Sequence, residues 1–188
     1  MNKKTDEELM MMFKTGNSRG FEILFERYRT RLFTFIFRML GQKRETAEDL
    51  FQEVYINVYK GKDFYEPTSR FSSWLFTIAR NHCLNYLKSQ KYRESLKTGS
   101  LDSEGFPEPS VPGTSDAGEK DNRLMLENAL STLSETYREI VLLRAVEGFS
   151  SQEIGEMLNM NPTTVRSNYY RARMELKKKL LPVLEGGE

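Results

Sequence analysis

The chain has 188 residues with 28 basic and 27 acidic side chains, and its formal net charge is +1. This length suits one domain or two small ones, and the nearly balanced charge gives no overall sign of a nucleic-acid partner. A single cysteine excludes an intramolecular disulfide, and no apolar run approaches the roughly 20 residues of a membrane helix. The N-terminal sequence lacks the apolar core of a signal peptide, so we expect a soluble cytoplasmic protein without membrane insertion.

Apolar residues recur at intervals of three and four through the first 94 residues, which is the helical period. Thr5, followed three residues later by Glu8, has the capping-box pattern of a helix start. A long helix is predicted from about residue 18 to 40, and Gly41 is expected to end it. The first part of the chain is therefore predicted to be helical.

The third predicted helix has an apolar stripe and a polar stripe. Thr46 with Asp49 forms another capping-box pattern, and the helix is expected to run to about Lys60. Acids and amides one turn apart on a helix can pair with arginines of a partner helix. The polar stripe consists of Asp49, Gln52, Glu53 and Asn57. By itself, a solvated helix face is the better explanation of this pattern.

An aromatic segment follows at residues 61–74, where glycine, proline, serine and threonine exclude a continuous helix. Its rings either pack into the core or form a stacking platform for unpaired bases. Both explanations stay open for Phe71 and Trp74. A further helix is predicted from about residue 72 to 92, and it ends in a basic cluster.

Residues 95–119 change the composition sharply, because they are rich in serine, glycine, proline and acid. Such a segment cannot bury enough apolar surface to fold alone, so we predict a flexible acidic linker and a domain boundary. Its acidity is consistent with solubility and also with occupancy of a basic channel that otherwise holds nucleic acid.

The region after the linker predicts two helices and then a helix-turn-helix. The first helix of the helix-turn-helix should be short and start after Ser150, a capping residue, and the turn should fall at Asn159. Asn161 is a good N-cap for the second helix, with Pro162 at its first position. The polar face of that helix carries side chains that reach phosphates and base edges: Thr163, Thr164, Arg166, Ser167, Asn168 and Arg171.

An ordinary helical hairpin is the alternative to DNA binding here. The combination of caps, turn and small residue favours DNA binding, and so does the basic end of the chain, which would hold phosphates. No strand pattern of any length occurs. The predicted fold class is all-α, with two small helical domains joined by the linker and a helix-turn-helix in the second.

Four motifs occur in order: AEDLFQEVYINVYK (47–60), FSSWLFTIARNHCLNYLK (71–88), YREIVLLRAVEGFSSQEIGEML (137–158) and TTVRSNYYRAR (163–173). With the two helical domains and the acidic linker, they resemble the extracytoplasmic-function (ECF) sigma factors of bacterial RNA polymerase. The resemblance spans nearly the whole chain. It implies sigma region 2 at residues 1–94, a linker at 95–119 and sigma region 4 at 120–188.

The resemblance also implies partners and roles. The polar stripe of the third helix would bind core RNA polymerase. The minus-ten element of promoter DNA would be recognised and melted by Phe71, Trp74, Asn81, Asn85 and Lys88. The polar face that starts at Thr163 would recognise the minus-thirty-five element. An anti-sigma factor is a further expected partner, and the protein is expected to be a monomer outside the polymerase complex.

Four positions depart from the family pattern. The family often has Asp at the position of Asn85, and Arg at the positions of Lys88 and Asn168. Replacing Arg by Lys removes a two-pronged hydrogen-bond donor, which affects contacts with DNA. Asn159 replaces a usual glycine in the turn.

Two other classes of protein compete with this interpretation. A conventional helix-turn-helix regulator would use residues 1–94 as a sensor or dimerisation domain and bind a two-fold symmetric site alone. An enzyme would need a catalytic cluster, and the sequence has no zinc-binding pattern around its one histidine, His82. We therefore expect no enzyme activity, no metal and no cofactor.

Overall fold

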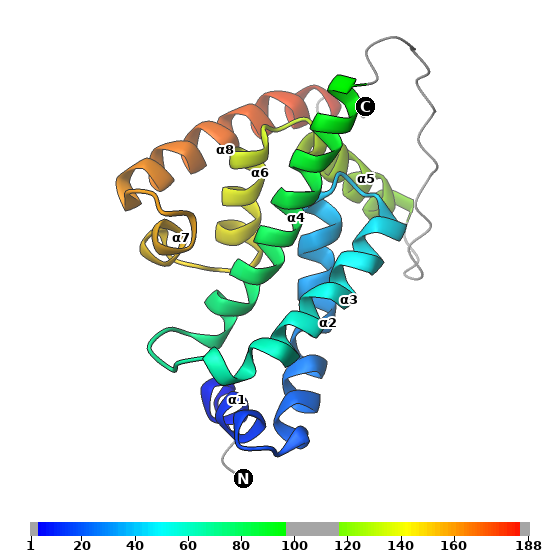
Figure 1. Cartoon of the computed structure of the whole chain (residues 1–188). Coiled ribbons are helices and arrows are strands. Elements are labelled where there is room, and N and C mark those ends of the chain that lie inside the picture. Colours follow the sequence, from blue (N-terminus) through cyan, green and yellow to red (C-terminus); the bar gives the residue numbers. More distant parts are fainter. Residues whose placement is uncertain (1–3, 97–116, 185–188) are drawn as a thin grey trace. The chain divides into compact units, whose positions relative to one another are not determined.

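A computed structural model describes residues 4–96 and 117–184. The chain divides into two compact units, Met1–Phe106 and Pro107–Glu188, called unit 1 and unit 2 here. Figure 1 shows helices throughout, and the described residues contain no strand. The predicted all-α fold class is therefore confirmed. None of the described helices is long and apolar enough to cross a membrane.

Unit 1 consists of α1 (Asp6–Lys14), α2 (Ser18–Met39), α3 (Arg44–Gly61), the 3-10 turn η1 (Lys62–Phe64) and α4 (Phe71–Leu96). The capping box at Thr5 is confirmed, because its side chain accepts from the Glu8 N–H and the Glu8 carboxylate accepts from the Thr5 N–H. The end of α2 also agrees with the prediction, since Gly41 follows it with a φ of +64°.

The predicted start of α3 was wrong. The helix begins at Arg44, and its N-cap Lys43 makes no side-chain capping hydrogen bond. Thr46 therefore lies inside the helix, where its hydroxyl oxygen is 3.5 Å from the hydroxyl oxygen of Tyr86 on α4. A threonine followed by an acid three residues later marks a helix start only when the chain enters the helix there.

The core of unit 1 lies between α2, α3 and α4. Residues at three- and four-residue spacing on each helix are almost completely buried, as the sequence period predicts. They include Leu32, Phe35, Ile36, Val54, Val58, Leu75, Phe76, Ala79 and Cys83. Gly20 lets α1 approach α2 closely, because a Cβ there would collide with the backbone carbonyl oxygen of Leu9.

Unit 2 consists of α5 (Ala117–Ser131), α6 (Glu135–Val141), the π-helical turn η2 (Leu142–Val146), α7 (Ser151–Leu158) and α8 (Pro162–Leu184). Both α4 and α5 extend into the predicted linker, so that prediction was too long at each end. The rest of the predicted linker, residues 97–116, lies outside the described part of the chain. The core of unit 2 includes Ile140, Leu143, Ile154, Leu158, Val165, Ala172 and Leu176.

A buried arginine joins the first two helices of unit 2. The Arg138 guanidinium donates to the carbonyl oxygens of Leu130, Ser131 and Leu133, at 3.0, 2.5 and 3.2 Å. Two of these carbonyls lie in the last turn of α5 and the third lies just after it, in a region where helical carbonyl groups run out of partners within the helix. Burial lowers the pKa of Arg138, and nearby Glu135 opposes this change.

Candidate nucleic-acid interface

The turn between α7 and α8 has the geometry that the sequence predicted. Asn159 adopts the left-handed conformation, with φ of +53° and ψ of +47°. The Met160 N–H donates to the Gly155 carbonyl oxygen at 2.8 Å, and a Cβ on Gly155 would lie only 2.6 Å from the Met160 carbonyl oxygen. Gly155 therefore allows the turn to fold back tightly on α7.

Caps hold both helices of this motif in place. The Ser150 side chain accepts from the Glu153 N–H at 3.1 Å, and the Glu153 carboxylate accepts from the Ser150 N–H at 2.8 Å. The Asn161 side chain accepts from the Thr163 N–H at 2.8 Å. Both predicted caps are therefore confirmed: Ser150 caps the start of α7, and Asn161 caps the start of α8.

One face of α8 is buried and the other is free for a ligand. Val165, Ala172 and Leu176 are at most 8% exposed and pack in the core of unit 2. The predicted DNA-contacting residues Thr163, Thr164, Arg166, Ser167 and Arg171 are exposed, and Asn168 is half-buried. The Ser167 hydroxyl donates to the Thr163 carbonyl oxygen at 3.0 Å, so this hydroxyl is fixed against the backbone of α8.

A second polar face lies on α4. Asn81, Asn85 and Lys88 are exposed and lie on one face, because their spacings are four and three residues. Trp74 lies two turns before Asn81 on the same face and is half-buried. Its ring centroid is 5.2 Å from that of Tyr65, so the indole rests on the segment that precedes α4.

The prediction for Phe71 needs correction. Its ring is 1% exposed and contacts the ring of Tyr28 edge-on, with 5.5 Å between centroids. It is a core residue and cannot stack on a base in this structure. Phe64 in η1 is 85% exposed instead, and the sequence did not single it out as a site residue.

Phe64 and Tyr65 are neighbours with opposite environments. Tyr65 is 1% exposed, and burial raises the pKa of its hydroxyl to about 12, with smaller contributions from Glu7 and Asp6. The 3-10 turn ends between the two residues, so one ring points inward and the other outward. Composition alone shows an aromatic segment, but the 3-10 turn determines which of the two rings is exposed to a ligand.

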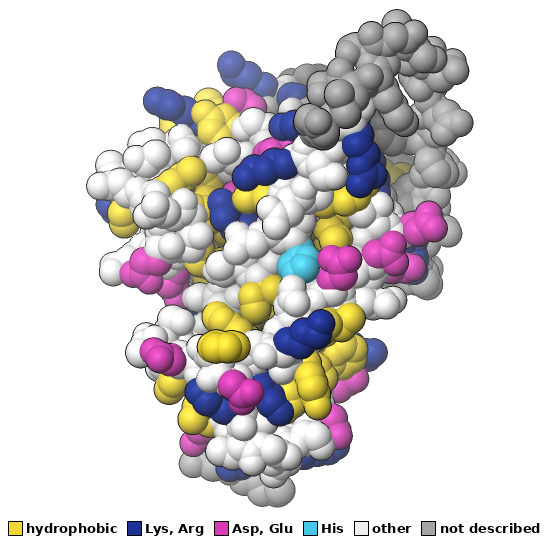
Figure 2. Space-filling view, in the orientation of Figure 1, with side chains coloured by type: hydrophobic (Ala, Val, Ile, Leu, Met, Phe, Trp, Pro, Cys, Tyr) yellow, Lys and Arg dark blue, Asp and Glu magenta, His cyan; other side chains and the backbone are white. Residues whose placement is uncertain are grey.

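A third polar surface lies on α3, where Asp49, Gln52, Glu53 and Asn57 are all exposed. His82 of α4 joins two of them, because its Nδ1 is 3.1 Å from the Glu53 carboxylate and its Nε2 is 2.6 Å from the Asn57 amide nitrogen. Figure 2 shows the histidine next to acidic side chains on this face. The part of the chain that the structure describes contains no cluster of three metal-ligating side chains.

Comparison with known proteins assigns the chain to a family. The family model for sigma-70 region 2 matches residues 24–93, and the model for sigma-70 region 4 matches residues 123–176. The RNA polymerase sigma factor CarQ of Myxococcus xanthus is 33% identical over 171 residues, which cover 91% of this chain and 95% of CarQ. The chain belongs to the ECF sigma factors. These proteins bind core RNA polymerase, recognise promoter DNA and help to open it, and they are initiation factors rather than enzymes.

Other similar proteins agree with this assignment. The ECF sigma factor SigW of Bacillus subtilis is 29% identical to this sigma factor, over 89% of this chain and 92% of SigW. The structure of RpoE from Bartonella quintana in complex with the anti-sigma factor NepR has a TM-score of 0.71 and 25% identity. That similarity covers 85% of this chain and 96% of the RpoE chain.

The region models cover the candidate residues of this sigma factor. The exposed residues of α3 and α4 fall within the region 2 match, together with Phe64. The exposed face of α8 falls within the region 4 match. Only residues 94–122 lie between the two matches, and a short interval there is what the resemblance to the ECF group implied.

Proposed function

We propose that unit 1 binds core polymerase and opens the minus-ten element, and that unit 2 recognises the minus-thirty-five element. The observation that carries this proposal is the surface of α8, where a capped helix presents polar and basic side chains on the face opposite its buried stripe. A helix with this surface suits the major groove, which admits an α-helix.

The α3 stripe is the proposed contact with core polymerase. Its four residues are exposed and polar, and two of them are acids. The contact of Glu53 with His82 limits how far that carboxylate can move. A carboxylate in a fixed position suits binding to a partner better than it suits a helix face that contacts only solvent. Carboxylates in this arrangement suit arginines on a helix of the partner.

The minus-ten element is proposed to contact α4 and η1. Asn81 and Asn85 offer amide groups that pair with base edges, and Lys88 offers a charge for a phosphate. Phe64 and Trp74 offer rings on which unpaired bases stack, with roughly 1–3 kcal/mol per base. The two rings flank the segment between η1 and α4 from opposite ends.

An anti-sigma factor is a proposed regulator. RpoE of Bartonella quintana was solved with the anti-sigma factor NepR, and CnrH was solved with the cytosolic domain of CnrY. We also propose that this sigma factor acts in the cytoplasm and is a monomer outside the polymerase complex.

The test is a pull-down of bacterial core RNA polymerase by this chain, followed by run-off transcription from genomic fragments. We expect stoichiometric binding and new start sites, whose upstream sequences identify the promoter. Failure to bind core, together with nanomolar binding to a palindromic duplex, would instead support the conventional helix-turn-helix regulator.

A further inference from the structure

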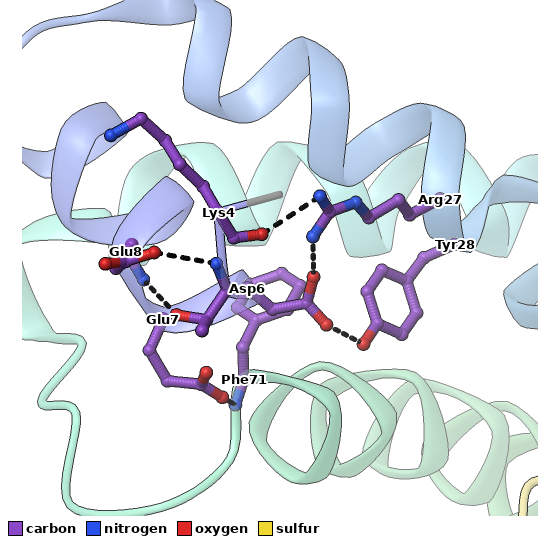
Figure 3. A network of polar contacts seen from close by, with 8 residues as sticks. Lys4, Asp6, Glu7, Glu8, Arg27, Tyr28 and Phe71 are labelled. Carbon is purple, nitrogen blue, oxygen red and sulfur yellow. Dashed lines mark hydrogen bonds and ion pairs between the residues drawn. The ribbon is translucent and has the colours of Figure 1, made fainter. Parts of the chain in front are cut away.

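The segment between η1 and α4 is held at both ends by α1. At its start, the Lys14 Nζ donates to the Tyr65 carbonyl oxygen at 2.9 Å. At its end, the Glu7 carboxylate accepts from the Phe71 N–H at 3.0 Å, and Figure 3 shows this contact. Phe64 directly precedes the first contact, and Trp74 lies one turn after the second.

The spacing on α1 makes this arrangement possible. Glu7 and Lys14 are seven residues apart, so they lie on the same face of the helix about 10 Å apart along its axis. Each side chain is half-buried, and each contacts the backbone rather than a side chain. These two contacts hold the segment in addition to the buried Tyr65 ring, whose hydroxyl donates to the Ser69 carbonyl oxygen at 3.4 Å.

Glu7 supplies what the start of α4 lacks. The first N–H groups of a helix have no partner within the helix, and a negative charge is favourable there. The first turn of α4 contains no acidic residue, and the residue that precedes Phe71 is Arg70, which has no side-chain oxygen. Glu7 therefore acts as a capping residue from another helix.

Separate contacts attach α1 to α2. The Asp6 carboxylate accepts from the Arg27 guanidinium at 2.5 Å and from the Tyr28 hydroxyl, and the Arg27 guanidinium also donates to the Lys4 carbonyl oxygen at 3.0 Å (Figure 3). Leu9, Met10 and Phe13 are buried on the same helix. With α1 fixed on α2, Glu7 and Lys14 have fixed positions from which to hold the segment.

We infer that Glu7 and Lys14 are positioning residues for promoter opening. They hold the two ends of the segment so that the rings of Phe64 and Trp74 are positioned to stack on unpaired bases. This inference rests on the proposed role of unit 1 at the minus-ten element. It assigns to α1, which carries none of the candidate DNA-contacting residues, a part in opening DNA.

The test compares Glu7→Ala, Glu7→Gln and Lys14→Met with wild type and with a matched control, Glu22→Ala. The control also removes a carboxylate from unit 1, but that carboxylate pairs with Arg19 on the exposed surface of α2, at 2.7 Å. Each full-length variant is combined with purified core polymerase on the promoter found by run-off transcription. A 2-aminopurine in the minus-ten element reports opening, and a separate titration measures affinity for core.

We expect Glu7→Ala and Lys14→Met to lower the equilibrium constant for opening by about fivefold, the size expected for loss of one hydrogen bond to the backbone. Glu7→Gln should fall between Glu7→Ala and wild type, because its amide oxygen still accepts the hydrogen bond without the charge. Glu22→Ala should open DNA as wild type does. Affinity for core should stay within about twofold of wild type in all variants, since α3 is untouched.

Wild-type opening by both Glu7→Ala and Lys14→Met would overturn the inference. A parallel loss of core affinity and of opening would also overturn it, because the residues would then merely stabilise unit 1. If Glu7→Ala does not fold, the comparison of Glu7→Gln with wild type decides the question. Failure of the proposed function is distinct, because wild-type protein itself would then fail to open the promoter.

Discussion

Two tyrosines of unit 1 bury their hydroxyl groups in different ways. The Tyr28 hydroxyl donates to Asp6, whereas the Tyr55 hydroxyl is buried and has no hydrogen-bond partner among the described residues. Burial raises the pKa of both groups, and Asp6 adds to the rise at Tyr28. A buried hydroxyl that lacks a partner costs stability, whereas a paired one does not.

We expect opposite effects from removing these two hydroxyls. Tyr55→Phe should leave the free energy of unfolding unchanged or raise it by up to about 1 kcal/mol, because an unpaired polar group is removed. Tyr28→Phe should lower it by about 1–3 kcal/mol, because Asp6 loses a donor. Urea denaturation followed by circular dichroism measures both changes. A larger loss for Tyr55→Phe than for Tyr28→Phe would contradict this explanation.

Arg138 pairs polar groups in unit 2, because its guanidinium donates to three carbonyl oxygens at and just after the end of α5. Arg138→Met should destabilise unit 2 by about 2–4 kcal/mol, since it removes the guanidinium from three carbonyl oxygens, of which the Leu130 oxygen keeps one donor, the Leu133 N–H. Lys178→Met, on the exposed surface of α8, is the control and should change stability by less than about 0.5 kcal/mol. Equal thermal melting of the two variants would refute the role given to Arg138.

Among the elements, η1 and the start of α4 decide which aromatic rings are available to DNA. Phe64 is 85% exposed and Phe71 is 1% exposed, although they are only seven residues apart. Substitution of each by alanine should therefore have a different consequence. The exposed ring contributes little to stability, and the buried ring contributes to the core that contains Tyr28.

Phe64→Ala should fold normally and lower promoter opening by about thirtyfold, which corresponds to the middle of the range of about 1–3 kcal/mol for loss of one base–aromatic stack. Phe71→Ala should lower the free energy of unfolding by about 3–5 kcal/mol, as expected for a buried phenylalanine. Opening is measured by 2-aminopurine fluorescence, and stability by chemical denaturation. Normal opening by a folded Phe64→Ala protein would remove Phe64 from the interface.

At the scale of the whole molecule, the proposal separates polymerase binding from recognition of the minus-thirty-five element. Asp49 lies in unit 1 and Arg171 in unit 2, and both are exposed, so neither substitution should unfold its unit. Each variant should therefore lose one activity and keep the other.

Arg171→Ala should weaken promoter-dependent transcription by about tenfold without changing affinity for core polymerase. Asp49→Lys should weaken binding to core, because it reverses a charge in the α3 stripe, and it should leave the α8 surface unchanged. Core affinity is measured by titration and transcription by run-off assay. Loss of core binding by Arg171→Ala would contradict the division of roles between the units.

The sequence by itself determined the helical architecture, the caps and the turn of the helix-turn-helix. These features depend on residues a few positions apart, such as Ser150 with Glu153, or on the backbone preference of one residue, such as Asn159. The family followed from the same motifs, because their order along the chain is part of the sequence.

Only the tertiary structure decided which rings face outward and what holds the segment that carries them. Phe64 and Phe71 belong to the same aromatic segment of the sequence, and contact with α2 buries only the Phe71 ring. Glu7 contacts a residue 64 positions away, and Lys14 contacts one 51 positions away. No local pattern encodes such partners, because they meet only after α1 has packed against the rest of unit 1.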